Sequence, residues 1–345
     1  MKCSPAMWRF LALVQALLLA LMLTQRLTDD FALRAPALAP TPALLHHASR
    51  MAHARAHLVP AAFEDPAHYY SSNAFLRAWK PSDFAAAARS LIEFRSGAVR
   101  LRQEALRSAR GHAVFDGAPS TQPCALKRYG ETSDPVWGLD GGKWLCDLPA
   151  LAGAEGCVVY SLGSNGQFEF ELEMVARTPC TVHTFDCTLN ETTLVLPSSP
   201  RIHFHALCAG EGRTGDSRYQ SLAALAAGLG HSKVDLLKMD IEGFEYRVVE
   251  SLYKDVLQGV TGAEQLLPLQ ISLEVHTQSR VESFPELPWG RAPGLSAVEL
   301  DAFWVPLTDL GYVVVSREDN RLCKTCSEFT AVRAFVSAPQ TQQQL

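Results

Sequence analysis

Short apolar runs alternate with segments of helical spacing through the second half of the chain. The runs are typical of buried strands, whereas a face such as Phe244, Val248 and Leu252 is typical of an amphipathic helix. The expected strands are residues 157–162, 181–185, 202–208, 234–239, 269–275, 312–316 and 329–336. This alternation predicts an α/β fold with a doubly wound, mostly parallel sheet. The last two strands are joined too closely for a helical crossover, so they should pair antiparallel.

A different pattern precedes this region. Residues 10–23 form an apolar run, with Lys2 and Arg9 before it and acidic residues after it. Its length suits a signal-peptide core and is short for a full bilayer span. The basic flank favours a single-pass type II signal anchor, with the body in the Golgi or ER lumen. A cleaved signal peptide, which would make the protein secreted, and a cytosolic amphipathic helix are the alternatives.

These patterns divide the chain into five parts. The segment after the anchor is rich in Ala, Pro and His and is typical of a stem. A helix is predicted from Ser82 to about residue 109, before the α/β region. The predicted parts are an anchor or signal peptide (1–30), a stem (31–66), a helical and cysteine-containing extension (67–150), the α/β domain (151–338) and a disordered tail (339–345).

Composition narrows the class of protein. Hydrophobic residues are 48% and charged residues 19% of the chain, which excludes wholesale disorder. The net charge of −5 argues against a nucleic-acid partner bound through its phosphates. Of the nine cysteines, all but Cys3 follow the apolar run, which suits disulfides in an oxidising lumen. Buried free thiols are the alternative. The sequon at Asn190 predicts a glycoprotein.

The ends of the first three strands carry residues suited to a nucleoside. In an open α/β sheet, ligands bind outside the carboxyl ends of the strands. A glycine turn follows the first strand and an acid, which could accept ribose hydroxyls or be a surface acid, follows the second. Adenine commonly lies at the end of the third strand. The predicted cofactor-binding residues at these three strand ends are Gly163, Ser164, Asn165, Gly166, Asp186, His205 and Ala206.

The most informative segment runs from Lys238 to Glu245. If the fourth strand continued through it, Lys238, Asp240 and Glu242 would share one face. The fifth strand ends in Glu274 and His276 and should lie beside the fourth, so these side chains should converge on one rim. Acid–base catalysis, a hard-cation site and a structural ion-pair cluster with Lys238 are three interpretations. The predicted catalytic residues are Asp240, Glu242, His276 and Glu274.

In their order along the chain and in their residues, these motifs resemble those of the FkbM-type S-adenosylmethionine-dependent methyltransferases and the related methyltransferase-like proteins of animals. The resemblance rests on YSLGSNGQFEFE, VHTFD, HFHAL, VDLLKMDIEGFEYRVVESL and SLEVH, and it covers about residues 121–337. The K-x-D-x-E-G-x-E block is its specific part, since a glycine turn alone is common.

The resemblance implies a class I, Rossmann-like fold of seven strands with the last strand inserted antiparallel. It implies that Gly163 and its neighbours hold the methionine part of S-adenosylmethionine, that Asp186 holds the ribose, and that Asp240 lies near the methyl group. Ser161 stands where many relatives have Asp or Glu, so their contact to the methionine amino group is not expected here.

The resulting prediction is an S-adenosylmethionine-dependent O-methyltransferase of the secretory pathway. Its partners would be a small-molecule or glycan acceptor and, through the N-terminal apolar segment, the membrane, but not nucleic acid. No metal ligand is assigned, and dependence on a divalent metal stays open. The alternatives are a type II glycosyltransferase, in which Asp240 and Glu242 would hold a metal, and a methyltransferase-like domain without activity.

Strand register predicts cysteine pairs. Cys157 and Cys180 each lie six residues before a predicted ligand contact, so they sit side by side if the first two strands are parallel neighbours. Cys124 with Cys146 is the second expected pair. Cys323-x-x-Cys326 is expected to be a local disulfide or two inert thiols, with a redox pair as the alternative.

Overall fold

The structure is a computed structural model, and it describes a defined part of the chain. The described residues are 111–116, 118, 124–130, 142–146, 156–190, 192–210, 216–277, 295 and 300–333. They all belong to Pro60–Leu345, the second of two compact units. The predicted anchor, the stem, the helix from Ser82 and the C-terminal tail lie outside the described residues. Within the described residues, no helix combines the length and apolarity that a membrane crossing requires.

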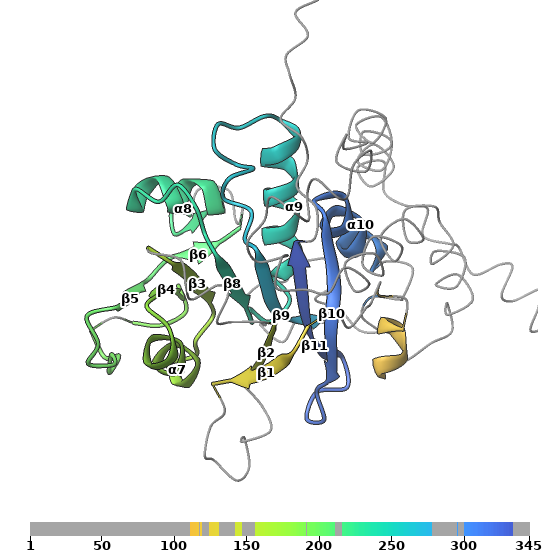
Figure 1. Cartoon of the computed structure of the whole chain (residues 1–345), viewed down its shortest axis with the longest axis horizontal. Helices are drawn as coiled ribbons and strands as arrows, with labels where there is room; N and C mark the ends of the chain where they lie inside the picture. Colours follow the sequence, from red (N-terminus) through yellow and green to blue (C-terminus); the bar gives the residue numbers. More distant parts are fainter. Residues whose placement is uncertain are drawn as a thin grey trace, which may run out of the picture. The chain divides into compact units, whose positions relative to one another are not determined.

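A seven-stranded sheet forms the centre of the domain (Figure 1). Its order is β10-β11-β9-β8-β3-β4-β5, parallel except where β11 pairs antiparallel with β9 and β10. The strands are β3 (Val158–Leu162), β4 (Thr181–Phe185), β5 (Ile202–His205), β8 (Leu236–Met239), β9 (Gln270–His276), β10 (Tyr312–Asp319) and β11 (Cys326–Arg333). The predicted mostly parallel sheet is confirmed, and so is the antiparallel insertion of the last strand.

Helices cover both faces of this sheet, as a doubly wound fold requires. Figure 1 shows α8, α9 and α10 on one side, and α7 with the β1–β2 hairpin on the other. Their bounds are α7 (Glu169–Arg177), α8 (Leu222–Leu229), α9 (Glu245–Leu257) and α10 (Asp301–Asp309), with a 3-10 helix η3 (Gly111–Phe115) before the hairpin. Ser221 caps α8, since its side chain accepts a hydrogen bond from the backbone N–H of Ala224.

Three predicted strand bounds are wrong. β10 runs three residues beyond the predicted end at 316, to Asp319, because it stays paired with β11. The run 202–208 is not one strand: β5 ends at His205 because its partner β4 ends at Phe185, opposite it. The chain then forms β6 (Cys208–Ala209), which pairs with β7 (Tyr219–Gln220) in a separate two-stranded sheet. The last strand begins at Cys326, three residues before the expected start, because Cys326 already pairs with His276.

The β1–β2 hairpin (Leu126–Tyr129 and Lys143–Cys146) packs onto the sheet and closes its core. Leu145 and Cys146 join the apolar cluster under α7. The side chain of Gln270 in β9 bonds both backbone groups of Cys146, at 2.7 and 3.0 Å. The hairpin is therefore seated in a defined register, which decides where its lysine, Lys143, points.

Four disulfides occur among the described residues; the sequence predicted two of them and left a third open between a local disulfide and two free thiols. Cys157–Cys180 and Cys124–Cys146 form as expected, and Cys323–Cys326 is a local disulfide. The fourth, Cys187–Cys208, was not predicted. Its signal was available, since both cysteines follow the ends of β4 and β5, which are parallel neighbours.

Candidate functional site

The turn after β3 lies directly against the loop after β8. Gly163, Asn165 and Gly166 have positive φ angles of 76°, 49° and 76°, so the chain reverses sharply. A Cβ atom at Gly163 would lie 1.9 Å from the carbonyl oxygen of Asp240. Glycine is therefore needed at 163 because the turn must approach Asp240, and this contact joins the predicted cofactor turn to the predicted catalytic loop.

Asp186 holds this turn in shape. Its Oδ2 accepts hydrogen bonds from the backbone N–H groups of Ser164 and Asn165, both at 3.0 Å. Its Oδ1 accepts from the backbone N–H of Thr188 at 3.0 Å and from the Thr188 hydroxyl at 2.5 Å. A carboxylate offers about four acceptor positions. Asp186 therefore reaches a ribose only by exchanging a donor such as the Thr188 hydroxyl, and its ribose contact stays a prediction.

Asp240 is paired with a buried lysine that the sequence did not point to. Lys143 is fully buried, and its Nζ lies 3.0 Å from Asp240 Oδ2 and also bonds Glu328 Oε1. A period-two pattern could have revealed it, because Lys143 shares the inward face of its strand with the buried Leu145. Two inward-facing positions on a four-residue strand are too weak a pattern to carry that prediction alone.

The strand does not continue through the acidic block, so the predicted shared face is wrong. β8 ends at Met239, and Glu242 has a φ of 57° in the turn that begins α9. Lys238 instead donates hydrogen bonds to the carbonyls of Leu162 and Gly163 and supports the glycine turn. Glu242 nevertheless reaches the rim, since its Oε2 lies 3.4 Å from His276 Nε2.

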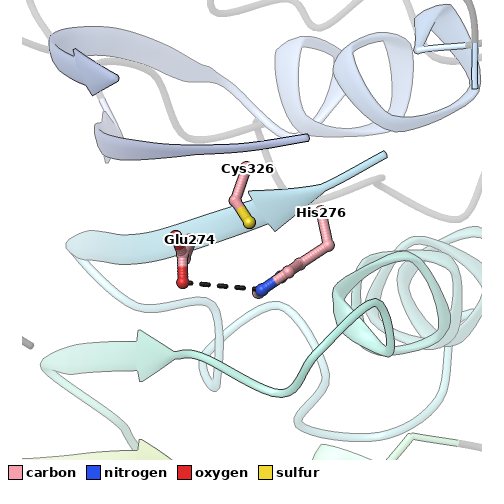
Figure 2. Close-up of side chains that lie close together, drawn as sticks. All are labelled: Glu274, His276 and Cys326. Carbon is pink, nitrogen blue, oxygen red and sulfur yellow. Dashed lines mark ion pairs between the residues drawn. The ribbon is translucent and has the colours of Figure 1, made fainter. Parts of the chain in front are cut away.

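Strand β9 brings Glu274 and His276 to the same rim. Figure 2 shows their side chains pointing toward one another, with the sulfur of Cys326 on neighbouring β11 close by. The Nε2 of His276 lies 3.5 Å from Glu274 Oε2, and its Nδ1 lies 3.1 Å from Glu245 Oε1. The predicted convergence of Asp240, Glu242, Glu274 and His276 is therefore what the structure shows.

The charged side chains at this rim shift one another's pKa values. Burial lowers the pKa of Lys143, but attraction from Asp240 and Glu328 outweighs burial and raises it. Burial likewise raises the pKa of Asp240, but Lys143, together with Lys238 and His276, outweighs burial and holds that pKa well below its usual range. Burial and then repulsion from Asp240 raise the pKa of Glu274 to about 8. Lys143 and Asp240 therefore form a charged pair, whereas Glu274 holds a proton at neutral pH.

His276 is protonated as well. Burial lowers its pKa, but the carboxylate of Glu245 and the other acids around the ring together outweigh burial and raise it to about 10. Its side chain is 1% exposed and that of Glu274 is 6% exposed, against 23% for Asp240 and 41% for Glu242. Asp240 and Glu242 are thus the acids of this rim that an incoming molecule can reach.

Three groups of side chains bring potential metal ligands within 4.8 Å of one another. They are Glu274, His276 and Cys326; Asp240, Glu242 and His276; and Asp240, Glu274 and Glu328. Thiolate is the form in which cysteine binds metals, and Cys326 is bound to Cys323 in a disulfide. The first group therefore lacks a ligand, whereas the other two consist of intact carboxylates and imidazole.

His205 and Ala206 lie at the end of β5, as predicted, but His205 belongs to a cluster of aromatic rings. Its Nε2 lies 3.0 Å from His183 Nδ1, and its ring stacks on Phe185 with centroids 4.8 Å apart. The rings of His203 and His231 also contact His183. The role of His205 and Ala206 beside adenine stays a prediction.

The histidine cluster makes stability depend on pH. Burial, with repulsion from His231, lowers the pKa of His183 to about 3. Below about pH 6.5 the unfolded chain therefore binds a proton at this histidine that the folded chain does not bind. The free energy of unfolding consequently decreases as the pH is lowered. We expect a loss of about 1 kcal/mol between pH 7 and pH 5, about half the full linkage value because of solvent screening.

Urea denaturation of wild type and His183→Gln at both pH values tests this. The variant should lose less stability on acidification than wild type. If the free energy of unfolding depended equally on pH in wild type and in His183→Gln, His183 would not be the source of the pH dependence.

Comparisons with known proteins identify the family of the chain. A protein-family model described as a methyltransferase domain matches residues 124–333. The probable methyltransferase-like protein 24 of Homo sapiens is 31% identical over 114 residues, which cover 30% of this chain and 30% of that protein. The Rattus norvegicus protein of that name is 32% identical over 194 residues, which cover 52% and 46%. The chain thus spans less than half the length of these curated relatives.

Solved structures give more distant similarities. The Methanococcus jannaschii fibrillarin pre-rRNA processing protein has a TM-score of 0.33 and 11% identity, covering 61% of this chain and 90% of that chain. The N-terminal domain of EvdMO1 with SAH bound has a TM-score of 0.32 and 10% identity, covering 59% and 81%.

Proposed function

Because the chain belongs to the methyltransferase-domain family, we propose that it transfers a methyl group from S-adenosylmethionine to a hydroxyl oxygen. The observation that carries this proposal is the contact between Gly163 and the Asp240 carbonyl, where a Cβ would lie at 1.9 Å. It places the glycine turn, at which ligands of such sheets bind, beside the acids of the rim. A donor held on the turn would therefore have its reactive end next to Asp240.

The charges of the side chains at this rim are suited to binding S-adenosylmethionine. S-adenosylmethionine, when bound, supplies an electrophilic methyl group on a positively charged sulfur. Asp240 carries a negative charge at neutral pH, because Lys143 depresses its pKa. Its side chain is 23% exposed and that of Glu242 is 41% exposed. An accessible anionic edge favours a cationic ligand at this place.

The chain's contribution would be mainly to orient the reactants and remove one proton. Glu242 is placed to accept the proton of the acceptor hydroxyl as the new C–O bond forms and the C–S bond breaks. His276 and Glu274 are protonated and nearly inaccessible, so they do not suit the role of base. They instead fix the shape of the rim around Glu242.

We place this activity in the secretory pathway, with a sugar or another hydroxylated small molecule as acceptor. Four disulfides among the described residues are typical of an oxidising compartment. Asn190 of the sequon is exposed on a surface turn, where a glycan could be attached. The apolar run at residues 10–23 would provide the anchor. The net charge of −5 favours such an acceptor over nucleic acid.

Calorimetry of the purified chain with S-adenosylmethionine tests the donor, and transfer of labelled methyl groups to lumenal glycan and lipid fractions tests the acceptor. We expect saturable heat, a raised melting temperature and label on a hydroxylated fraction. Binding of a nucleotide sugar with manganese, and none of S-adenosylmethionine, would identify a glycosyltransferase instead. Binding of neither would indicate a domain without activity.

A further inference from the structure

The disulfide Cys187–Cys208 lies at the edge of the sheet where the second and third expected strands carry their predicted cofactor residues. Cys187 follows Asp186 directly, and Cys208 follows Ala206 by two positions. Strands β4 and β5, which are parallel neighbours, both end just before this bond. The disulfide therefore joins the two loops between which a nucleoside would lie at this edge.

Further hydrogen bonds converge on the two bonded cysteines. Arg218 donates from Nη1 to the Cys187 carbonyl at 3.2 Å, and its own carbonyl accepts from the backbone N–H of Cys208 at 2.8 Å. Thr188, the residue after Cys187, donates from its backbone N–H and its hydroxyl to Asp186 Oδ1. The acid predicted to hold the ribose thus belongs to a loop that the disulfide and Arg218 both fix.

The disulfide also ties the small β6–β7 sheet to the end of β4. β6 begins at Cys208, and Tyr219 of β7 packs on Phe244 with ring centroids 5.5 Å apart. A Cβ atom at Gly210 would lie 3.3 Å from a ring carbon of Phe244. Phe244 comes two positions after Glu242. The β6–β7 sheet therefore reaches from the loops after β4 and β5 to the turn that carries the accessible acid of the rim.

We propose that Cys187 and Cys208 are positioning residues for the donor: their disulfide holds the loops after β4 and β5 in the arrangement that binds the nucleoside of S-adenosylmethionine. This inference rests on the proposed function. A loop already fixed in its bound conformation loses little freedom when the ligand binds, and a disulfide is one way to fix it. Without the bond, part of the binding free energy would offset the ordering of the loops.

The chain offers a matched comparison at the opposite edge of the sheet. Cys157–Cys180 joins the residues just before β3 and β4. Its cysteines are 23 positions apart, against 21 for Cys187–Cys208. In the chain-entropy account, the stabilisation from a disulfide depends on this separation, so the two bonds should stabilise the fold to a similar degree. They differ in the edge of the sheet on which they lie.

Calorimetry with S-adenosylmethionine on the full chain, as wild type, Cys187→Ala/Cys208→Ala and Cys157→Ala/Cys180→Ala, tests the proposal. We expect the donor Kd to rise at least about tenfold in the first variant and less than about threefold in the second, while both melting temperatures fall. Labelled methyl transfer at saturating donor should give Cys187→Ala/Cys208→Ala a turnover number within about threefold of wild type, because the bond acts on donor binding and not at the reacting groups.

Circular dichroism with a melting curve checks that each variant folds. Arg218→Gln is a further variant that keeps the disulfide but removes the hydrogen bond to the Cys187 carbonyl. The Arg218 side chain is 55% exposed, so this variant should fold, and we expect its donor Kd to rise about threefold.

Wild-type donor affinity in folded Cys187→Ala/Cys208→Ala overturns the proposal, and if that variant does not fold, wild-type affinity in Arg218→Gln does so. An equal loss of donor affinity in both cysteine variants also overturns it, since loss of either disulfide would then have the same effect. If wild type binds no S-adenosylmethionine, the proposed function fails and this proposal with it. Donor binding that is equal in wild type and Cys187→Ala/Cys208→Ala removes only this proposal.

Discussion

Replacing Lys143 with methionine is expected to lower the free energy of unfolding by about 3–5 kcal/mol. Lys143 is fully buried and bonds both Asp240 and Glu328. Methionine fills much the same volume but leaves two carboxylates without their cation, so the loss comes from uncompensated charge rather than from a cavity. Urea denaturation monitored by circular dichroism, with all disulfides intact, gives the value.

A double variant tests that explanation. The variant Lys143→Met/Glu328→Gln removes one of the two carboxylate charges that Lys143→Met leaves unpaired. We expect its free energy of unfolding to be about 1–2 kcal/mol higher than that of Lys143→Met. Lys127→Met, on the exposed side of β1 in the same hairpin, is the control and should change stability by less than about 0.5 kcal/mol. A loss in Lys143→Met no larger than in Lys127→Met would show that the buried pair contributes nothing.

Asp240→Asn is expected to lower the turnover number for methyl transfer by at least about 100-fold. The substitution keeps the size of the side chain but removes the negative charge that Lys143 maintains beside the glycine turn. Labelled methyl transfer at saturating donor measures turnover, and calorimetry measures donor affinity separately. A fall in turnover with a folded protein indicates a role at the reacting groups.

Asp116→Asn is the matched control, because Asp116 is an exposed acid paired with Arg317 far along the chain. It should transfer methyl groups at the wild-type rate. Turnover of Asp240→Asn within threefold of wild type, with unchanged donor affinity, would contradict the placement of Asp240 in the catalytic machinery.

The fold could be predicted because its signals are local. Apolar runs of strand length and amphipathic segments such as the face of Phe244, Val248 and Leu252 alternate along the chain, and parallel strands demand such crossovers. Parallel adjacency of β3 and β4 then placed Cys157 beside Cys180. The resemblance to methyltransferase-like proteins is confirmed, whereas its narrower FkbM-type assignment stays a prediction.

The candidate site could be predicted in part. Asp240, Glu242, Glu274 and His276 meet because β8 and β9 are parallel neighbours whose carboxyl ends share an edge. The prediction that Glu242 reaches the rim as part of a continuing strand was wrong. Strand β8 ends at Met239, and Glu242 reaches the rim from a turn in which its φ is positive.

The sequence by itself determined the sheet, its helices and the edge on which the acids gather, because periodicity and strand ends are properties of neighbouring residues. Only the tertiary structure decided that Lys143 pairs with Asp240 and keeps it ionised, that Glu245 orients His276, and that Asp186 is bound to the glycine turn. These contacts join residues 22 to 97 positions apart. The strength of these contacts and the pKa values they produce depend on burial and on interatomic distance, and both are set by how the distant segments pack in the folded chain.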